Sequence, residues 1–217
     1  RFERVSGECV ASYLHAGGKI GVVVAADGAD DVKEALTNVA MQIAAMNPQY
    51  ISRADISEEE MAKMRDITVE SALNDPASLP KPIQNELYAK VEADNLFSAE
   101  DLAILAEKKN DKYLYNFLSK EAIAKLAELA LAGKAAYVEN KIFAGLVEGR
   151  ISKQLKEICL LDQTYVKAED GKQSVANYIK EVAKAAGANL EVKSFVRFET
   201  GEGIEKKNED FAAVCCE

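Results

Sequence analysis

Strand-forming sequence is concentrated at the two ends of this 217-residue chain, and this distribution constrains the fold more than any other feature. Residues 4–14 and 19–26 are rich in Val, Ile and Tyr, and residues 189–199 alternate apolar with polar side chains. Residues 57–160, by contrast, carry patterns typical of helices. A sheet with one apolar face needs helices to cover that face. We therefore predict an α+β fold, in which a small three-stranded antiparallel sheet packs on two helices and a long all-helical insertion interrupts the chain.

The first two strand segments are expected to form a hairpin. Residues 15–18, His-Ala-Gly-Gly, join them, and the two glycines can adopt the positive φ of a tight turn. The segment from Ile20 to Val24 is almost continuously apolar, which is typical of a central strand. The third segment alternates strictly, so we expect one face to carry Leu190, Val192, Ser194, Val196 and Phe198 and the other to carry Glu191, Lys193, Phe195, Arg197 and Glu199.

Two amphipathic helices are expected to cover the sheet. The first spans residues 30–46, where Asp30 or Asp31 can serve as the N-cap. Asn47-Pro48 ends this helix, because a residue before proline avoids the α region. The second helix spans residues 174–186.

The helical insertion opens with a capping box at Ser57-Glu58-Glu59-Glu60. Further helices are expected at residues 82–93, 98–108, 120–131 and 135–149, the last with an apolar stripe of Val138, Ile142 and Leu146. Packing within one domain explains such stripes, with pairing between molecules as the alternative. The predicted domains are residues 1–56 with 160–217, an α+β core subdomain with a C-terminal module, and residues 57–159, a coiled-coil-like helical insertion suited to dimerisation.

Composition and charge argue against several classes of protein. A net charge of −9 disfavours binding to nucleic acid, which draws on clustered Lys and Arg. No apolar run approaches the ~20 residues of a membrane span, and we expect no secretory signal, since no positively charged segment followed by an apolar core occurs at the start of the sequence. The four cysteines are therefore expected as free thiols in a reducing, cytoplasmic compartment. The chain starts at Arg1 inside a strand-like segment, so we expect it to be a piece of a longer protein.

No catalytic, cofactor or metal site is expected. His15 is the only histidine, which removes Ser-His-Asp, Cys-His and histidine-rich metal sites from consideration. Gly201-Glu202-Gly203 lacks the residues of a phosphate loop. The pair Cys215-Cys216 leaves a thiol enzyme as an alternative, but no basic residue follows Lys207 to lower a thiolate pKa. We therefore expect no enzyme and no small-molecule substrate.

Two exposed-looking features could instead contact a protein partner. His15 lies at the tip of the expected hairpin, where it is either an inert surface residue or a contact. Tyr165 and Val166, followed by Lys167, place apolar side chains in an otherwise polar loop. They either tuck into the core or form a small contact patch, and the residues alone leave both readings open.

Four segments, in the same order along the chain, resemble the elongation factor Ts family. They are its hairpin, Tyr13 to Val22; the following helix, Ala40 to Tyr50; the end of its coiled-coil excursion, from Gly133-Lys134 to Lys167; and its C-terminal module, Val196 to Lys206 with Asp210-Phe211-Ala212-Ala213. Residues 74–132 are longer than in common members, and their role is open.

The resemblance implies a protein partner. Elongation factor Ts is the guanine nucleotide exchange factor of the translational GTPase elongation factor Tu, so we expect elongation factor Tu as partner and a possible homodimer. The matching partner-binding positions are His15, Tyr165, Val166 and Lys167. The Thr-Asp-Phe-Val motif with which the family displaces GDP does not occur in residues 1–217. The alternative is a structural self-association module without exchange activity.

Overall fold

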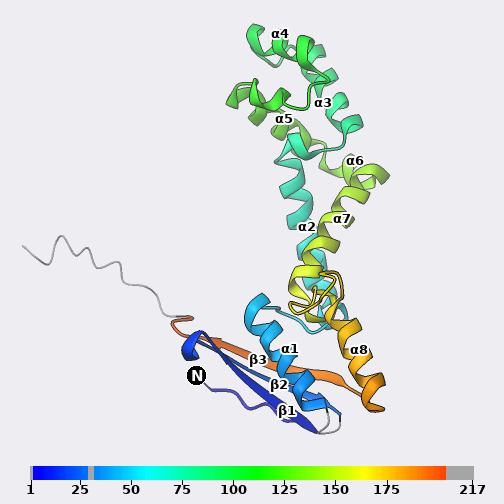
Figure 1. Ribbon diagram of the computed structural model, residues 1–217. Coiled ribbons are helices and arrows are strands. Elements are labelled where there is room, and N and C mark those ends of the chain that lie inside the picture. The colour runs from blue at the N-terminus through cyan, green and yellow to red at the C-terminus, as the bar shows by residue number, and fades with distance from the viewer. Residues whose placement is uncertain (1, 29–31, 204–217) are drawn as a thin grey trace, which may run out of the picture. The chain divides into compact units, whose positions relative to one another are not determined.

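The structure, a computed structural model, describes residues 2–28 and 32–203. The two aspartates expected to cap the first helix, the 210–213 segment and Cys215-Cys216 lie outside the described residues. The chain divides into two compact units (Figure 1). The first unit comprises Arg1–Arg53 and Lys156–Glu217, and the second comprises Ala54–Leu155.

The first unit contains the predicted three-stranded antiparallel sheet, which confirms the α+β class. Its strands are β1 (Cys9–His15), β2 (Ile20–Asp27) and β3 (Glu191–Glu199), and the apolar β2 is central, as expected. The turn between β1 and β2 is a short 3-10 segment, η1 (Ala16–Gly18), in which all three residues have positive φ. The two glycines adopt this conformation without the steric cost that a side chain would add.

A β-bulge in β3 changes which side chains face the core. Ala25 of β2 pairs with Ser194 and Ala26 pairs with Val192, so Lys193 is an extra residue. One extra residue reverses the direction of every side chain that follows it. The expected common face of Val192, Val196 and Phe198 is therefore wrong, and Phe195 packs against the core instead.

Two helices cover the core face of the sheet, α1 (Lys33–Met46) and α8 (Val175–Ala186). Figure 1 shows α1 lying across the strands. The core joins side chains of the sheet to side chains of both helices, among them Val22, Val24, Leu36, Val39, Ile43, Val175 and Ile179. Asn47 ends α1 in the left-handed region, and its N–H donates to the Ile43 carbonyl just before Pro48. Ser174 caps α8 by accepting from the Asn177 N–H.

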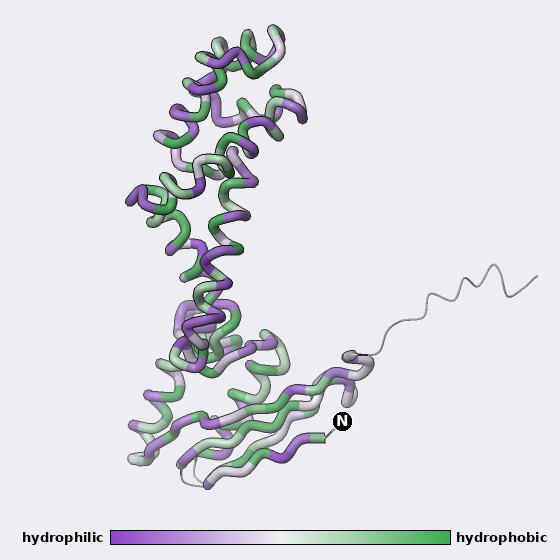
Figure 2. Tube along the Cα trace, turned by 180° about the vertical axis from the view of Figure 1, so that it is seen from behind, coloured by the Kyte–Doolittle hydropathy of each residue, from purple (hydrophilic) through white to green (hydrophobic). Residues whose placement is uncertain are grey.

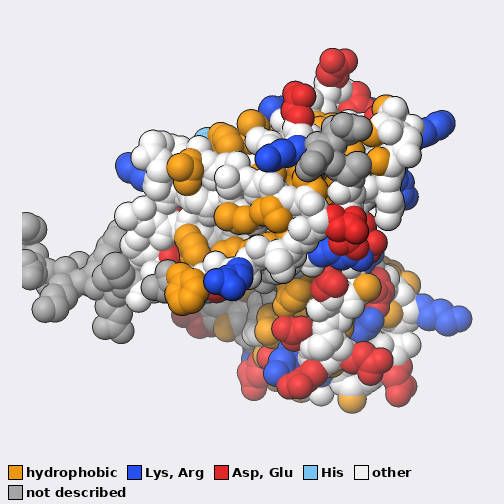
Figure 3. All heavy atoms as spheres, turned by 90° about the horizontal axis from the view of Figure 1, so that it is seen from below, with side chains coloured by type: hydrophobic (Ala, Val, Ile, Leu, Met, Phe, Trp, Pro, Cys, Tyr) orange, Lys and Arg blue, Asp and Glu red, His pale blue; other side chains and the backbone are white. Residues whose placement is uncertain are grey.

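The opposite face of the sheet is apolar at one end. Leu14 is 72 % exposed there, and with Val5, Val196 and Phe198 it lines a groove of about 280 Å³. Figure 3 shows hydrophobic side chains gathered on the face seen from below. The bulge in β3 creates this surface, because it turns the two β3 side chains away from the helices.

Backbone hydrogen bonds join the two ends of the first unit's interrupted chain. The N–H groups of Gln49 and Tyr50 donate to the Ile158 carbonyl at 2.8 and 3.1 Å. The Leu160 N–H in turn donates to the Tyr50 carbonyl at 2.9 Å, and Tyr50 forms a parallel bridge with Cys159. We call residues 49–51 and 158–161 the paired segments.

The second unit, residues 54–155, consists of helices joined by turns and contains no strand, and the structure describes all of these residues. Its helices are α2 (Glu58–Leu73), α3 (Lys81–Ala93), α4 (Ala99–Lys108), α5 (Lys120–Ala132), α6 (Lys134–Glu139) and α7 (Lys141–Ile158), whose last residues belong to the first unit. Figure 2 shows hydrophobic and hydrophilic residues alternating along these helices. Among the described residues, no helix combines the length and apolar composition that crossing a bilayer requires.

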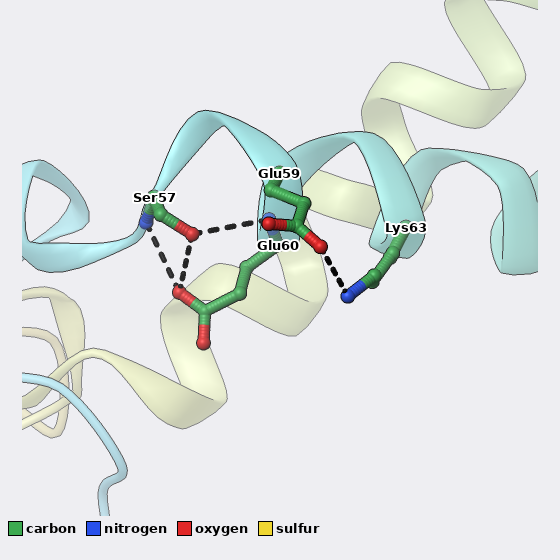
Figure 4. Close-up of polar contacts among 4 residues, drawn as sticks. All are labelled: Ser57, Glu59, Glu60 and Lys63. Carbon is green, nitrogen blue, oxygen red and sulfur yellow. Dashed lines mark hydrogen bonds and ion pairs between the residues drawn. The ribbon is translucent and has the colours of Figure 1, made fainter.

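The predicted capping box at the start of α2 is confirmed (Figure 4). The Ser57 hydroxyl accepts from the Glu60 N–H at 3.2 Å, and the Glu60 carboxylate accepts from the Ser57 N–H at 3.1 Å. Two N–H groups that the first turn leaves without helical partners are satisfied in this way.

The helix expected at residues 135–149 is instead two helices, because Asn140 interrupts it. Asn140 has an extended ψ of 121° and ends α6. Its side-chain oxygen then accepts from the Ile142 N–H at 2.9 Å, which caps α7. The expected stripe is wrong as well, since Val138 and Ile142 are 47 % and 51 % exposed. The buried face of α7 carries Phe143, Val147, Ile151 and Leu155.

Candidate partner-binding site

The hairpin tip presents His15 at the end of β1, where the residue is exposed. Its Nδ1 atom lies 3.1 Å from the Tyr13 hydroxyl, and the two rings are tilted with centroids 5.9 Å apart. Tyr13 packs against the core with part of its surface. The imidazole is therefore held at a protruding turn by a neighbour that is itself anchored.

The second predicted contact region is the loop of residues 163–168. Its two apolar side chains point in opposite directions: Tyr165 is only 6 % exposed, whereas Val166 is 46 % exposed. The Tyr165 ring stacks on Tyr178 of α8, with centroids 4.1 Å apart. The structure thus brings Tyr165, Val166 and Lys167 together in one loop, while His15 comes from a separate turn of the same unit.

Tyr165 anchors the loop and has little surface of its own to offer a partner. Its N–H donates to the Gln173 carbonyl at 2.8 Å. Burial of the phenol, together with its hydrogen bond to Tyr178, raises the pKa of Tyr165 well above its ordinary value. The phenol therefore stays neutral at any physiological pH.

Lys167 is exposed but tethered. Its Nζ donates to the Asn38 side-chain oxygen on α1 at 2.7 Å, and the Asn38 amide donates to the Tyr178 hydroxyl at 3.0 Å. These contacts connect the loop to both helices that cover the sheet. Beside the loop, Lys167, Lys172 and Glu181 line an open hollow of about 800 Å³, a polar surface of mixed charge.

Sequence reasoning missed the two buried glutamines beneath the loop, Gln42 of α1 and Gln163. Gln42 is 0 % exposed and Gln163 is 1 % exposed, and the Gln42 amide donates to the Gln163 side-chain oxygen at 3.1 Å. The signal was present in the sequence, because Gln42 falls on the apolar stripe of the predicted helix beside Val39 and Ile43. A polar residue on such a stripe must find hydrogen-bonding partners in the core.

The part of the chain that the structure describes shows no metal-binding cluster. Across residues 2–28 and 32–203, no group of three His, Cys, Asp or Glu side chains is placed to hold a metal ion. The thiols of Cys9 and Cys159 are buried and are not joined in a disulfide. The unit instead presents two exposed segments, the hairpin tip with His15 and the loop of residues 163–168, and neighbouring side chains hold each of them.

Comparison with known proteins gives consistent matches. The sequence model of the family described as Elongation factor TS matches residues 1–202. Elongation factor Ts of Clostridium perfringens (strain ATCC 13124) is 34 % identical over 217 residues, covering 98 % of this chain and 51 % of the relative. The proteins of the same name from Clostridioides difficile (strain 630) and from a Nitratiruptor species are also each 34 % identical, covering 94 % and 98 % of this chain and 47 % and 52 % of their own lengths. The chain spans about half the length of the curated relatives it matches.

Proposed function

The chain belongs to the elongation factor Ts family, and we propose that it binds elongation factor Tu and takes part in the exchange of GDP for GTP on that GTPase. An exchange factor binds the nucleotide-free GTPase more tightly than the GDP form, and by linkage the affinity for GDP falls by the same factor. Such a protein needs a binding surface and no group that makes or breaks covalent bonds. We therefore assign no enzymatic activity to the chain. We assign it to the cytoplasm, because translation takes place there.

The observation that carries the proposal is the loop of residues 163–168. Val166 is 46 % exposed, while its neighbour Tyr165 is stacked in the interior and Lys167 is held by Asn38. Ordering a flexible loop on binding costs free energy. A loop that is already ordered in the free protein avoids this cost and therefore binds its partner more tightly. An exposed aliphatic side chain on such a support is suited to fill a pocket of a partner.

We propose that this chain provides binding affinity for elongation factor Tu. The family's Thr-Asp-Phe-Val motif, which does not occur in residues 1–217, would then account for most of the displacement of GDP. The chain is then expected to form a complex with elongation factor Tu but to release bound GDP slowly. Release of fluorescent GDP, followed with and without the chain, measures the second point, and gel filtration of the mixture measures the first. Rapid release at micromolar concentrations of the chain would contradict the division of labour.

Self-association through the second unit is the second candidate function. The exposed apolar side chains Val138 and Ile142 are the observation that favours it, because such groups are often covered in an assembly. The same gel filtration distinguishes the candidates. A dimer that does not bind elongation factor Tu would replace the exchange-factor proposal with this one.

Replacing either His15 or Val166 with alanine is expected to weaken the complex with elongation factor Tu by about 1–2 kcal/mol, the usual cost of truncating an interface contact of this kind. Titration calorimetry on the purified chain measures the change. Both side chains are exposed, so the melting temperature should stay almost unchanged.

Val138→Ala provides the matched control for Val166→Ala. It makes the same truncation at a valine that is 47 % exposed, but in the second unit. Binding to elongation factor Tu should be unaffected. A large fall in melting temperature for Val166→Ala or His15→Ala would show that the residue supports the core and would remove it from the proposed interface.

A further inference from the structure

Gln42 is a polar side chain placed where the core would otherwise be apolar. It lies on α1 between Val39 and Ile43, and all three residues are 0 % exposed. An amide buried without partners loses its hydrogen bonds to water, which destabilises the folded state. A glutamine at this position must therefore make hydrogen bonds that an apolar side chain of similar size could not make.

The hydrogen bonds of the Gln42 side chain all go to the loop of residues 163–168. The Gln42 side-chain oxygen accepts from the Val166 N–H at 2.8 Å. Its amide nitrogen donates to the Thr164 carbonyl at 3.0 Å and to the Gln163 side-chain oxygen at 3.1 Å. Gln163 is fixed in turn, because its own amide donates to the Glu157 carbonyl at 2.7 Å.

These contacts grip the backbone on both sides of Tyr165. With Thr164 and Val166 held by one side chain, the residue between them points inward, and Val166 points to solvent. The partner of the Val166 N–H is a side chain on α1, so the direction of the Val166 side chain depends on a residue far away in the sequence.

We infer that Gln42 is a positioning residue, which sets the affinity for elongation factor Tu by fixing the conformation in which the loop presents Val166. This inference rests on the proposed function. Gln42 itself is buried and has no exposed surface to offer a partner. Its effect on binding would therefore pass through the loop that it holds, and through the Val166 side chain that the loop presents.

The test uses Gln42→Met in the 217-residue chain, because methionine nearly preserves the volume of glutamine while removing all three hydrogen bonds. Binding to elongation factor Tu is expected to weaken about tenfold, close to the loss caused by Val166→Ala. The double variant should bind no more weakly than Val166→Ala alone, since residues that act through one contact are not additive. Combination with His15→Ala should instead multiply the two losses.

Hydrogen exchange of the Val166 amide, followed by NMR, gives a readout independent of binding. The amide should exchange at least tenfold faster in Gln42→Met, because its acceptor has gone. Two controls separate this effect from general destabilisation. Val39→Ala truncates a buried residue of the same helix without removing a hydrogen bond to the loop, and Gln84→Met makes the same change at a buried glutamine of the second unit. Both should keep the wild-type affinity and the slow exchange at Val166.

The outcomes distinguish the inference from the function on which it rests. If Val166→Ala weakens the complex and Gln42→Met does not, or if their effects multiply in the double variant, the positioning role is wrong and the proposed function stands. If the wild-type chain does not bind elongation factor Tu, the proposed function fails and the affinity role of Gln42 fails with it. Equal losses for Val39→Ala and Gln42→Met would also overturn the positioning role, because general destabilisation would then explain both.

Discussion

Replacing Leu36 with alanine is expected to lower the free energy of unfolding by about 3 kcal/mol, within the range of about 2–5 kcal/mol found for buried leucines. Leu36 lies near the start of α1 and is 0 % exposed in the core of the first unit. The loss combines the removed apolar surface with the cavity that the surrounding side chains fail to close. Denaturant titration followed by circular dichroism measures it.

Leu14→Ala is the matched control, because it makes the same truncation in the same unit at a leucine that is 72 % exposed. Its cost should be below about 1 kcal/mol, as for most surface changes. Equal destabilisation by the two variants would mean that the helix face assigned to the core is wrong, or that the outer face of the sheet is covered in solution.

Replacing Asp101 with alanine is expected to lower the free energy of unfolding by about 2–3 kcal/mol, because it removes a carboxylate that links the N-caps of two helices and leaves part-buried donors without their acceptor. Asp101 lies in the first turn of α4 and is 5 % exposed. Its carboxylate accepts from the Ser119 N–H at 2.9 Å, from the Ser119 hydroxyl at 2.8 Å and from the Ser98 hydroxyl at 2.7 Å. The two serines are the N-caps of α4 and α5, so one side chain joins the starts of both helices.

The same carboxylate makes the second unit sensitive to acid. Burial raises the pKa of Asp101, but the hydrogen bonds from Ser119 and Ser98 oppose it and leave the pKa below the ordinary value. A carboxyl group with a lowered folded-state pKa adds stability above its unfolded pKa of about 3.9, and this stability is lost as the pH falls through the folded value. Asp101→Asn cannot titrate, so its stability should depend less on pH below about 4 than that of the wild type.

Glu100→Gln serves as the control, since Glu100 occupies the same turn but is exposed. It should change neither the stability at neutral pH nor the response to acid by a measurable amount. If Asp101→Ala and Glu100→Gln had the same effect, the buried carboxylate would not be the element that joins the two helices.

The sequence predicted those parts of the fold that depend on near neighbours in the chain. The capping box at Ser57 and the helix stop at Asn47-Pro48 involve residues a few positions apart, and both are found where expected. The central position of β2 followed from its continuous apolar run. Strict alternation failed in β3, because an extra residue at Lys193 leaves no mark on the pattern of side chains. The alternation rule favoured an all-apolar face, whereas the core face actually includes Phe195 followed by Arg197, whose register partner is the buried Val22.

The candidate site was predictable as a pair of segments but not as a geometry. The sequence left open whether Tyr165 and Val166 point inward or outward, and the structure gives a different answer for each. That difference depends on Gln42 and Tyr178, which lie on other elements and reach the loop only in the folded chain. Whether His15 and the loop bind elongation factor Tu stays a prediction.

The paired segments have a consequence for how genes of this family can change. Their hydrogen bonds are made by backbone groups of residues 49–51 and 158–161, so the pairing does not depend on the side chains encoded between them. Closing a long loop costs only slightly more free energy than closing a short one. Evolution can therefore lengthen, shorten or exchange the helices between the paired segments. The first unit, with its sheet, its two covering helices and its loop, can still assemble on the same backbone pairing.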